Sequence, residues 1–357
     1  MNGAAFDAER MNGLADALAY QDRILQGVSR TFALTIPQLP PALRRVVGNA
    51  YLLCRIADTI EDSESLPVAE KRRYYDRFVQ ALNDRGSGAE FGQDLASKLE
   101  DGTLDAERDL VRNSECVLRV THSFSTDEQR ALQRCIRIMS DGMEEFQEGQ
   151  FTHGLRDEAH LDAYCYHVAG VVGEMLTHLF CAHSHEIAAR RNELESRAVS
   201  FGQGLQMTNI LKDIWEDRQR QVCWLPRATF ARAGFDLRHL ETAPGNAAFQ
   251  EALAHLLGVA RRHLEVALDY TLLIPKSEPG IRAFCLWAIG MAVLTLRNIN
   301  RRRDFTSGAE VKITRQSVRA TIYLTRLFGW SNRLLRLAFR AATAGLPKPA
   351  PVAPEQS

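Results

Sequence analysis

The strongest constraint on the fold is the spacing of apolar residues, which is helical along most of the chain, while strand-like alternation is nearly absent. Proline and glycine fall mostly at segment boundaries; Pro41 and Pro67 each stand at a predicted helix start. Ser125 before Asp127 and Glu128 is typical of a capped helix start. We therefore expect an all-α protein. Further helices are predicted at about 105–121, 126–149, 158–188, 191–219, 247–273, 278–302 and 314–344.

The chain of 357 residues shows no break in composition and no short repeat. We therefore predict one all-helical domain over residues 1–344. The remaining segment, 345–357, holds four prolines, and this composition predicts a disordered tail.

Charge and cysteine content narrow the class of protein. Forty-four basic and forty-four acidic residues give zero formal net charge, which excludes a general polyanion-binding protein and predicts no nucleic-acid partner. Seven scattered cysteines without a CxxC pair indicate a reducing compartment. The longest uncharged stretch, 283–296, is shorter than the roughly 20 residues of a spanning helix, and no signal peptide is visible. We expect a cytoplasmic protein whose most apolar helix lies in the core.

Asp58, Glu61 and Asp62 lie three and four residues apart, so they share one face of a helix. They follow an apolar stretch and end the predicted helix, where negative charge is unfavourable because the helix dipole is negative at that end. Like charges so close also repel each other. A hard divalent cation, completed by phosphate oxygens, would compensate.

The same spacing returns in Asp213, Glu216 and Asp217, again after an apolar stretch. A single motif of this kind is common on solvated helix faces. Two of them, each at the end of a mostly apolar helix, predict facing acidic helices that bind several metal ions and grip a diphosphate. Di-iron bundles also use facing carboxylates, but with Glu-x-x-His, and neither motif has a histidine at that offset.

Four segments together resemble the squalene/phytoene synthases, a family of head-to-head prenyl transferases. They occur in the family's order, and the resemblance covers about residues 20–325. It implies an all-α bundle of the isoprenoid-synthase type with a central cavity. The segments are 29–33 (SRTFA), 51–62 (YLLCRIADTIED), 164–173 (YCYHVAGVVG) and 206–217 (QMTNILKDIWED).

Within this family, segments 164–170 and 308–315 (GAEVKITR) look like those of the squalene synthase branch, and the second is associated there with NADPH. The resemblance then implies a reaction in two steps. Two farnesyl diphosphates form presqualene diphosphate, which NADPH reduces to squalene. Mg²⁺ or Mn²⁺ would assist, and a transient contact with a membrane surface during product release stays open.

The resemblance also implies roles for individual residues. Metal ions neutralise the departing diphosphate, guanidinium groups bind phosphate oxygens in forks, and aromatic faces stabilise cations. The predicted metal ligands are Asp58, Glu61, Asp62, Asn209, Asp213 and Asp217. The predicted substrate contacts are Ser29, Arg30, Phe32, Arg55, Gln206, Asn209 and Lys212. The predicted catalytic residues are Tyr164, Tyr51, Arg55, Asp58, Asp62, Asp213 and Asp217, with Tyr164 in the first step.

Other assignments stay open at this stage. Glu216 either helps to bind metal or faces solvent. Either Arg218 or Arg220 supplies a phosphate contact that eukaryotic relatives make from the position of Val222. The small residues Ala169, Gly170 and Gly173 either clear volume for prenyl chains or allow close helix packing.

No dinucleotide-binding fingerprint is present, so NADPH would bind without a Rossmann fold. The resemblance implies that Lys312 and Arg315 reach its 2′-phosphate and that Phe284 and Cys285 lie near the nicotinamide. The alternatives are a reductant-free dehydrosqualene or phytoene synthase and, from another class, a non-catalytic helical assembly factor. The last alternative should have eroded acidic motifs, whereas both motifs here are intact.

Overall fold

The computed structural model describes residues 2–29, 31–149 and 151–348. Within these ranges all regular secondary structure is helical, and the only β-type pairing is an isolated bridge between Leu155 and Pro226. The all-α prediction is confirmed. Contacts divide the chain into two compact units. Unit 1 comprises Met1–Gly149 and His178–His183, and unit 2 comprises Gln150–Thr177 and Ser184–Ser357. The single domain over residues 1–344 stays a prediction, and most of the predicted tail lies outside the described residues.

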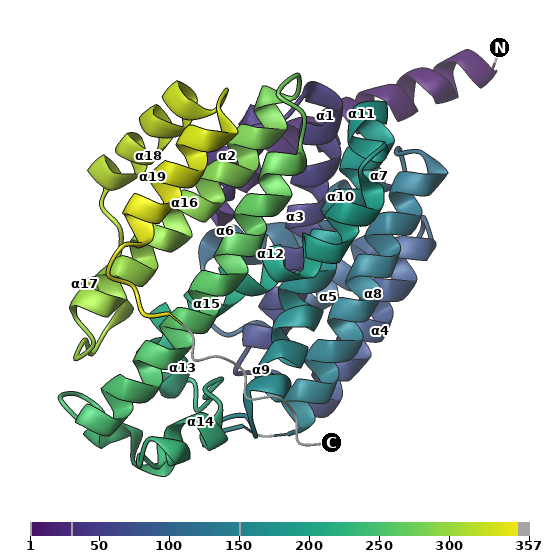
Figure 1. The fold of residues 1–357 in the computed structure, drawn as a ribbon. Helices are drawn as coiled ribbons and strands as arrows, with labels where there is room; N and C mark the ends of the chain where they lie inside the picture. Colours follow the sequence, from purple (N-terminus) through teal and green to yellow (C-terminus); the bar gives the residue numbers. More distant parts are fainter. Residues whose placement is uncertain (1, 30, 150, 349–357) are drawn as a thin grey trace. The chain divides into compact units, whose positions relative to one another are not determined.

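Unit 1 is built around the buried helix α3, which contacts α1, α6, α7 and α8 (Figure 1). Leu52, Leu53 and Ile56 of α3 are fully buried. Asn49 adds a buried polar link, because its amide donates to the Val117 carbonyl at 2.9 Å and accepts from Thr121 at 2.7 Å. The helices of this unit are α1 (Asn2–Val28), α2 (Phe32–Thr35), η1 (Ile36–Gln38), α3 (Pro41–Asp62), α4 (Val68–Asn83), α5 (Gly88–Lys98), α6 (Asp105–Arg112), α7 (Ser114–Thr121) and α8 (Thr126–Glu148).

Unit 2 is centred on α12, α15 and α16, which pack on one another (Figure 1). The α10 helix begins in unit 2 and ends in residues assigned to unit 1. The helices are α9 (Glu158–Cys165), the π-helix η2 (Tyr166–Gly170), α10 (Val171–His183), α11 (His185–Ala188), α12 (Arg191–Lys212), α13 (Ile214–Gln219), α14 (Arg227–Arg232), η3 (Leu237–Thr242), α15 (Ala247–Leu273), α16 (Pro279–Arg301), α17 (Gly308–Val311), α18 (Arg315–Phe328) and α19 (Asn332–Thr343).

Several predicted helices are broken in the structure. The segment predicted at 191–219 ends as α12 at Lys212, because Asp213 leaves helical geometry with φ −100° and ψ 17°. The segment predicted at 314–344 divides after Phe328 into α18 and α19. The capped start at Ser125 is confirmed, since Ser125 and Glu128 form a reciprocal capping box.

Glycines explain how closely α12 packs in unit 2. A Cβ atom on Gly202 would lie 2.0 Å from the Ala169 carbonyl oxygen, and one on Gly173 would lie 2.1 Å from the Ala198 carbonyl oxygen. Real Cβ atoms do not approach backbone so closely. Of the two interpretations of the small residues near 170, the structure therefore supports close helix packing.

The α16 helix is long and apolar enough to cross a membrane by length and composition, with a mean hydropathy of 1.6 in its most apolar window. However, 72% of that window is buried inside the protein. Leu296 and Ile299 are fully buried, and Phe284 is almost so. The predicted core position of this apolar stretch is confirmed.

Candidate active site

The acidic motif of unit 1 forms an ion-pair network around Arg55. This guanidinium lies 3.7 Å from Asp58 on the same helix and hydrogen-bonds Glu107 on α6. Burial alone would lower the pKa of Arg55, but the two carboxylates outweigh it and raise that pKa. Arg55 Nε is buried and has no hydrogen-bond partner among the described residues, so one donor stays available to an anion.

Around Asp58 the carboxylates outnumber the basic groups that oppose them. Burial raises the pKa of Asp58 to about 7, and the neighbouring carboxylates of Asp62 and Glu107 add to the rise, although Arg55 opposes it. The protein alone therefore supplies too little positive charge to stabilise the ionised carboxylate of Asp58. A bound cation would supply the missing positive charge.

The predicted substrate residues before α3 gather beside Tyr51. Its ring lies 5.1 Å from that of Phe32, and its hydroxyl donates to the Val28 carbonyl at 2.9 Å. The Ser29 hydroxyl accepts from the Phe32 amide at 2.9 Å and also hydrogen-bonds Tyr51. Burial is the main reason that the pKa of Tyr51 is raised. Arg30 lies outside the described residues.

The end of α3 is stabilised by neighbouring side chains as well. The Glu61 carbonyl accepts from Lys71 Nζ at 2.6 Å and from Gln147 at 2.9 Å, so cationic and amide donors satisfy a helix-end carbonyl. The sequence argument, which considered only a metal ion there, was incomplete. Tyr75 lies close to the same carboxylates, and its buried hydroxyl has no hydrogen-bond partner in the described part of the chain.

The acidic motif of unit 2 starts at the break between α12 and α13. Asp213 is the residue between the two helices, and its carboxylate lies 2.9 Å from Lys212 Nζ. Burial raises the pKa of Asp213 and Glu216 adds to this effect, whereas Lys212 and Arg220 oppose it. Gln206 is half-buried and Asn209 is exposed on α12. They precede Asp213 at intervals of three and four residues, so they lie along the side of α12 that leads to Asp213.

Arg220, rather than Arg218, belongs to this motif. Its guanidinium donates to the buried Asp217 carboxylate at 2.6 Å. Arg218 instead pairs with Glu241 at 3.1 Å, and both of those side chains are exposed. Each acidic motif therefore has an arginine paired with one of its aspartates: Arg55 lies three residues before Asp58, and Arg220 lies three residues after Asp217.

Glu216 joins the acidic motif to the segment predicted to bind the reductant. One of its carboxylate oxygens accepts from the Gly308 amide at 2.9 Å and from the Ser307 hydroxyl at 3.4 Å. A Cβ atom on Gly308 would lie 3.0 Å from the Lys212 carbonyl, so only glycine fits without displacement. Neither alternative raised for Glu216 included this contact.

Tyr164 is buried at the end of α9 and stacks on Trp224, with ring centroids 3.9 Å apart and planes 10° apart. The chain continues from α9 into the π-helix η2. Such segments are rare and are frequent at functional sites.

The residues predicted for NADPH separate into two groups. Lys312 and Arg315 are exposed at the junction of α17 and α18, where the Asn298 amide donates to the Lys312 carbonyl at 3.3 Å. Phe284 and Cys285 are buried in α16, and burial raises the pKa of the Cys285 thiol to about 12. These two side chains therefore have a packing role in the core of unit 2, and their contact with a cofactor stays a prediction.

The donor set of the two motifs fits a hard cation. It consists of carboxylate and amide oxygens, which Mg²⁺ prefers, and Glu216 Oε2 is buried with no hydrogen-bond partner among the described residues. Within the same part of the chain, no three acidic, histidine or cysteine side chains are already arranged to hold a metal ion. Mg²⁺ commonly takes only one or two carboxylates and completes its shell with water and phosphate. That the two motifs face each other stays a prediction.

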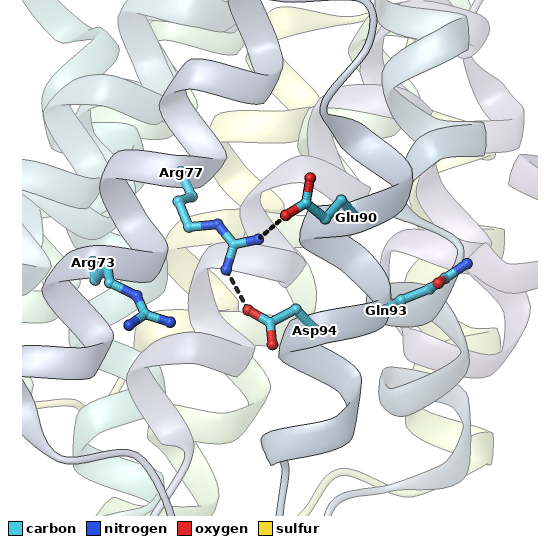
Figure 2. Close-up of a pocket in the computed structure, with 5 residues that line it drawn as sticks. All are labelled: Arg73, Arg77, Glu90, Gln93 and Asp94. Atoms are coloured by element: carbon cyan, nitrogen blue, oxygen red, sulfur yellow. Dashed lines mark hydrogen bonds and ion pairs between the residues drawn. The ribbon is translucent and has the colours of Figure 1, made fainter.

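A pocket of about 550 Å³ lies elsewhere in unit 1, between α4 and α5 (Figure 2). Figure 2 shows Arg77 turned toward Asp94 and Glu90, with its guanidinium 3.9 Å from the Glu90 carboxylate. None of the residues that line the pocket is a predicted site residue. The ion pairs join the two helices, and we assign the pocket no catalytic role.

Sequence reasoning missed Glu107, Tyr75 and Trp224. Glu107 lies 52 residues from Arg55 along the chain, so their pairing follows from the packing of α6 on α3. The only signal in the sequence was the acidic start of the helix predicted at 105–121. Trp224 lies near Arg220 and could have been suspected as an aromatic neighbour of the second motif.

The helical fold and the two acidic motifs define an all-α protein of the isoprenoid-synthase type. The chain belongs to the squalene/phytoene synthase family, whose model matches residues 25–317. The family prediction made from the four sequence segments is confirmed.

Individual relatives agree with this assignment. The chain is 30% identical over 285 residues to a squalene synthase of Botryococcus braunii, covering 78% of the chain and 57% of that protein. It is 27% identical over 295 residues to a squalene synthase of Gibberella zeae, covering 82% of the chain and 61% of that protein. The chain thus spans less than two thirds of the length of these curated relatives. The solved structure of TcSQS with the ligand BPH1237 is 25% identical, with a TM-score of 0.70, and the match covers 92% of this chain and 99% of that one.

Proposed function

We propose that the chain is a prenyltransferase that joins two farnesyl diphosphates head to head into presqualene diphosphate and then reduces this intermediate with NADPH to squalene. The observation that carries the proposal is the repeated arrangement of an acidic motif with its own arginine, Arg55 with Asp58 and Arg220 with Asp217. Membership of the squalene/phytoene synthase family supports it.

The residues of the two motifs bind and orient the diphosphate groups. Arg55 Nε is a donor for a phosphate oxygen, Arg220 places a guanidinium beside Asp217, and Lys212 adds a positive charge beside Asp213. When bound, Mg²⁺ would be held by Asp58, Glu61, Asp62, Asn209, Asp213 and Asp217 and would neutralise the charge that develops on the leaving diphosphate. The acidic side chains thus serve as cation holders, and the arginines contact the substrate directly.

Tyr164 acts in the formation of the cyclopropane ring, a step that must lose one proton. Its hydroxyl accepts and relays that proton, while Trp224 stacks on its ring and fixes its orientation. The aromatic pair also offers a weakly nucleophilic wall to a carbocation.

We expect Tyr164→Phe to lower the rate of presqualene diphosphate formation by about 100-fold or more, the usual contribution of a positioned acid or base. The phenylalanine keeps the stack on Trp224, so the fold should be unchanged. Tyr270→Phe is the matched control, because it removes another buried tyrosine hydroxyl of unit 2, bonded to Thr177 at 2.9 Å. Presqualene diphosphate formation is followed by mass spectrometry, and a normal rate in Tyr164→Phe would contradict the role.

The second half-reaction uses the segment from Gly308 to Arg315. Lys312 and Arg315 bind the 2′-phosphate of NADPH, and Glu216 holds the start of this segment against the second acidic motif. Glu216 thereby links the segment that binds the reductant to the acidic motif that binds diphosphate. The seven cysteines, none of them in a disulfide among the described residues, support a cytoplasmic location.

The proposal is tested by incubating the purified chain with farnesyl diphosphate and Mg²⁺, with and without NADPH, and identifying products by mass spectrometry. We expect presqualene diphosphate without NADPH and squalene only with it. Dehydrosqualene in both reactions would overturn the reductant part alone. Turnover of a twenty-carbon donor in place of farnesyl diphosphate would instead assign the chain to phytoene synthesis.

A further inference from the structure

The two C-terminal helices of unit 2 leave large apolar side chains in solvent. Among the described residues eight large apolar side chains are exposed, and five of them belong to α18, α19 and the turn between them. Tyr323 is 68% exposed, Trp330 66% and Leu337 63%. No residue of α18 is buried, so this helix lies on the surface of the unit. The five are Tyr323, Leu324, Leu327, Trp330 and Leu337.

The charged side chains of the same region are all basic. Residues 311–348 contain eight lysines and arginines and no aspartate or glutamate, although the whole chain has no net charge. Arg336 is the basic side chain of α19 that pairs with an acid, Asp269 of α15, at 2.5 Å. Arg319 and Arg333 are exposed. Basic and apolar groups therefore meet on one surface with no acidic side chain in this part of the sequence.

Helical spacing places these groups in one row along each helix. Arg319, Tyr323 and Leu327 follow each other at intervals of four residues, so they form a row along α18. Trp330 extends this row into the turn, and Arg333 and Leu337 repeat the four-residue interval on α19. We call these six residues the α18–α19 face.

The turn that carries Trp330 is held by hydrogen bonds from a buried arginine of α16. The guanidinium of Arg282, which is almost fully buried, donates to the Gly329 carbonyl at 3.3 Å and to the Asn332 side chain at 2.8 Å. The Trp330 indole donates to the Leu327 carbonyl at 2.7 Å. The residues on both sides of Trp330 are thus anchored to the buried Arg282, and the indole is tied to the end of α18 although most of its surface is exposed.

We propose that the α18–α19 face docks on the surface of a membrane that contains anionic phospholipids. Tryptophan and tyrosine prefer the boundary between headgroups and acyl chains. Arginines lie along such a surface with their apolar stems inward and their charges on the phosphates. Residues 311–348 contain no acidic side chain, and Asp269 of α15, which lies against α19, is paired with Arg336, so an anionic surface meets little repulsion there.

A second copy of the chain fits this face less well. A two-fold dimer would bring the same surface of both copies together. Arg319 and Arg333 would then oppose their own kind without an acidic partner from this segment. An anionic lipid surface complements both the charge and the apolar side chains.

The test is co-sedimentation of the full chain with vesicles of phosphatidylcholine alone and of phosphatidylcholine with about 30% phosphatidylglycerol. We expect binding only to the anionic vesicles, weaker at high salt. The double variant Arg319→Gln with Arg333→Gln should bind about 30-fold less tightly, since each basic residue near such a surface contributes about fivefold. Trp330→Ser should weaken binding about tenfold or more. Arg130→Gln and Leu104→Ser are matched controls, being exposed arginine and leucine sites of unit 1 that should leave binding unchanged.

The readout needs no catalysis, so it is independent of the proposed function. Circular dichroism and thermal unfolding check that every variant is folded. Equal binding to neutral and anionic vesicles, or full binding by the folded variants, would overturn the proposal. A dimer in lipid-free solution that Trp330→Ser dissociates would overturn it too, because the face would then be an interface between copies.

Discussion

We expect the Asp58→Asn variant to turn over farnesyl diphosphate at least about 100-fold more slowly than the unchanged chain while folding no less stably. The amide keeps the shape of the side chain but carries no charge to hold a cation at the diphosphate. Burial already raises the pKa of Asp58, which means that the ionised carboxylate makes the folded protein less stable than the neutral form would. Losing the charge should therefore leave the midpoint of thermal unfolding equal or higher.

The combination of these two effects is the test. Turnover is measured by diphosphate release over a range of Mg²⁺ concentrations, and stability is measured by thermal unfolding. Glu64→Gln is the matched control, because Glu64 is an exposed acid two residues beyond Asp62 and should change neither quantity. A variant that unfolds at a clearly lower temperature would show that Asp58 mainly supports the fold through Arg55. Normal turnover would remove Asp58 from the site.

Continuous apolar periodicity made the long helices predictable from the sequence. The segment predicted at 247–273 coincides with α15, and Asn246 caps its start by accepting from two amides of the first turn. The break at Asp213 was not predictable, because the apolar spacing runs through it unchanged. Contacts with the distant residue Gly308 lie beside this break, and a sequence pattern does not contain them.

The same limit applies to the site. The acidic residues could be found from their spacing, since three carboxylates on one helix face are a local feature. Their partners could not, because Glu107 and Gly308 reach Arg55 and Glu216 only through packing within each unit. Arg220 is an intermediate case: it is local to Asp217, but choosing it over Arg218 required the observed ion pairs.

These contacts change how the second motif is understood. From the sequence, Glu216 either helps to bind metal or faces solvent, whereas Glu61 is a predicted metal ligand. In the structure it holds the Gly308 amide, at the start of the segment that carries Lys312. A change that disturbs Glu216 would therefore affect both half-reactions, whereas a change at Lys312 reaches only the reductant.

For this reason we expect Lys312→Ala to separate the two half-reactions. Presqualene diphosphate should form at the normal rate, but squalene formation should need about tenfold or more NADPH, since a charge-assisted contact to phosphate is worth about 1.5–3 kcal/mol. The Lys312 carbonyl is held by Asn298, so the backbone should stay in place without the side chain. Lys276→Ala removes another exposed lysine of unit 2 and serves as the control.

NADH, which has no 2′-phosphate, makes this experiment specific. If Lys312 binds that phosphate, the variant should lose its preference for NADPH over NADH while its use of NADH stays unchanged. Products and both KM values are followed by mass spectrometry from the same reactions. Equal loss of presqualene diphosphate and squalene would show that Lys312 supports the site as a whole. A preserved preference for NADPH would move the phosphate contact to another basic residue, and Arg315, three residues further on and also exposed, would be the next to replace.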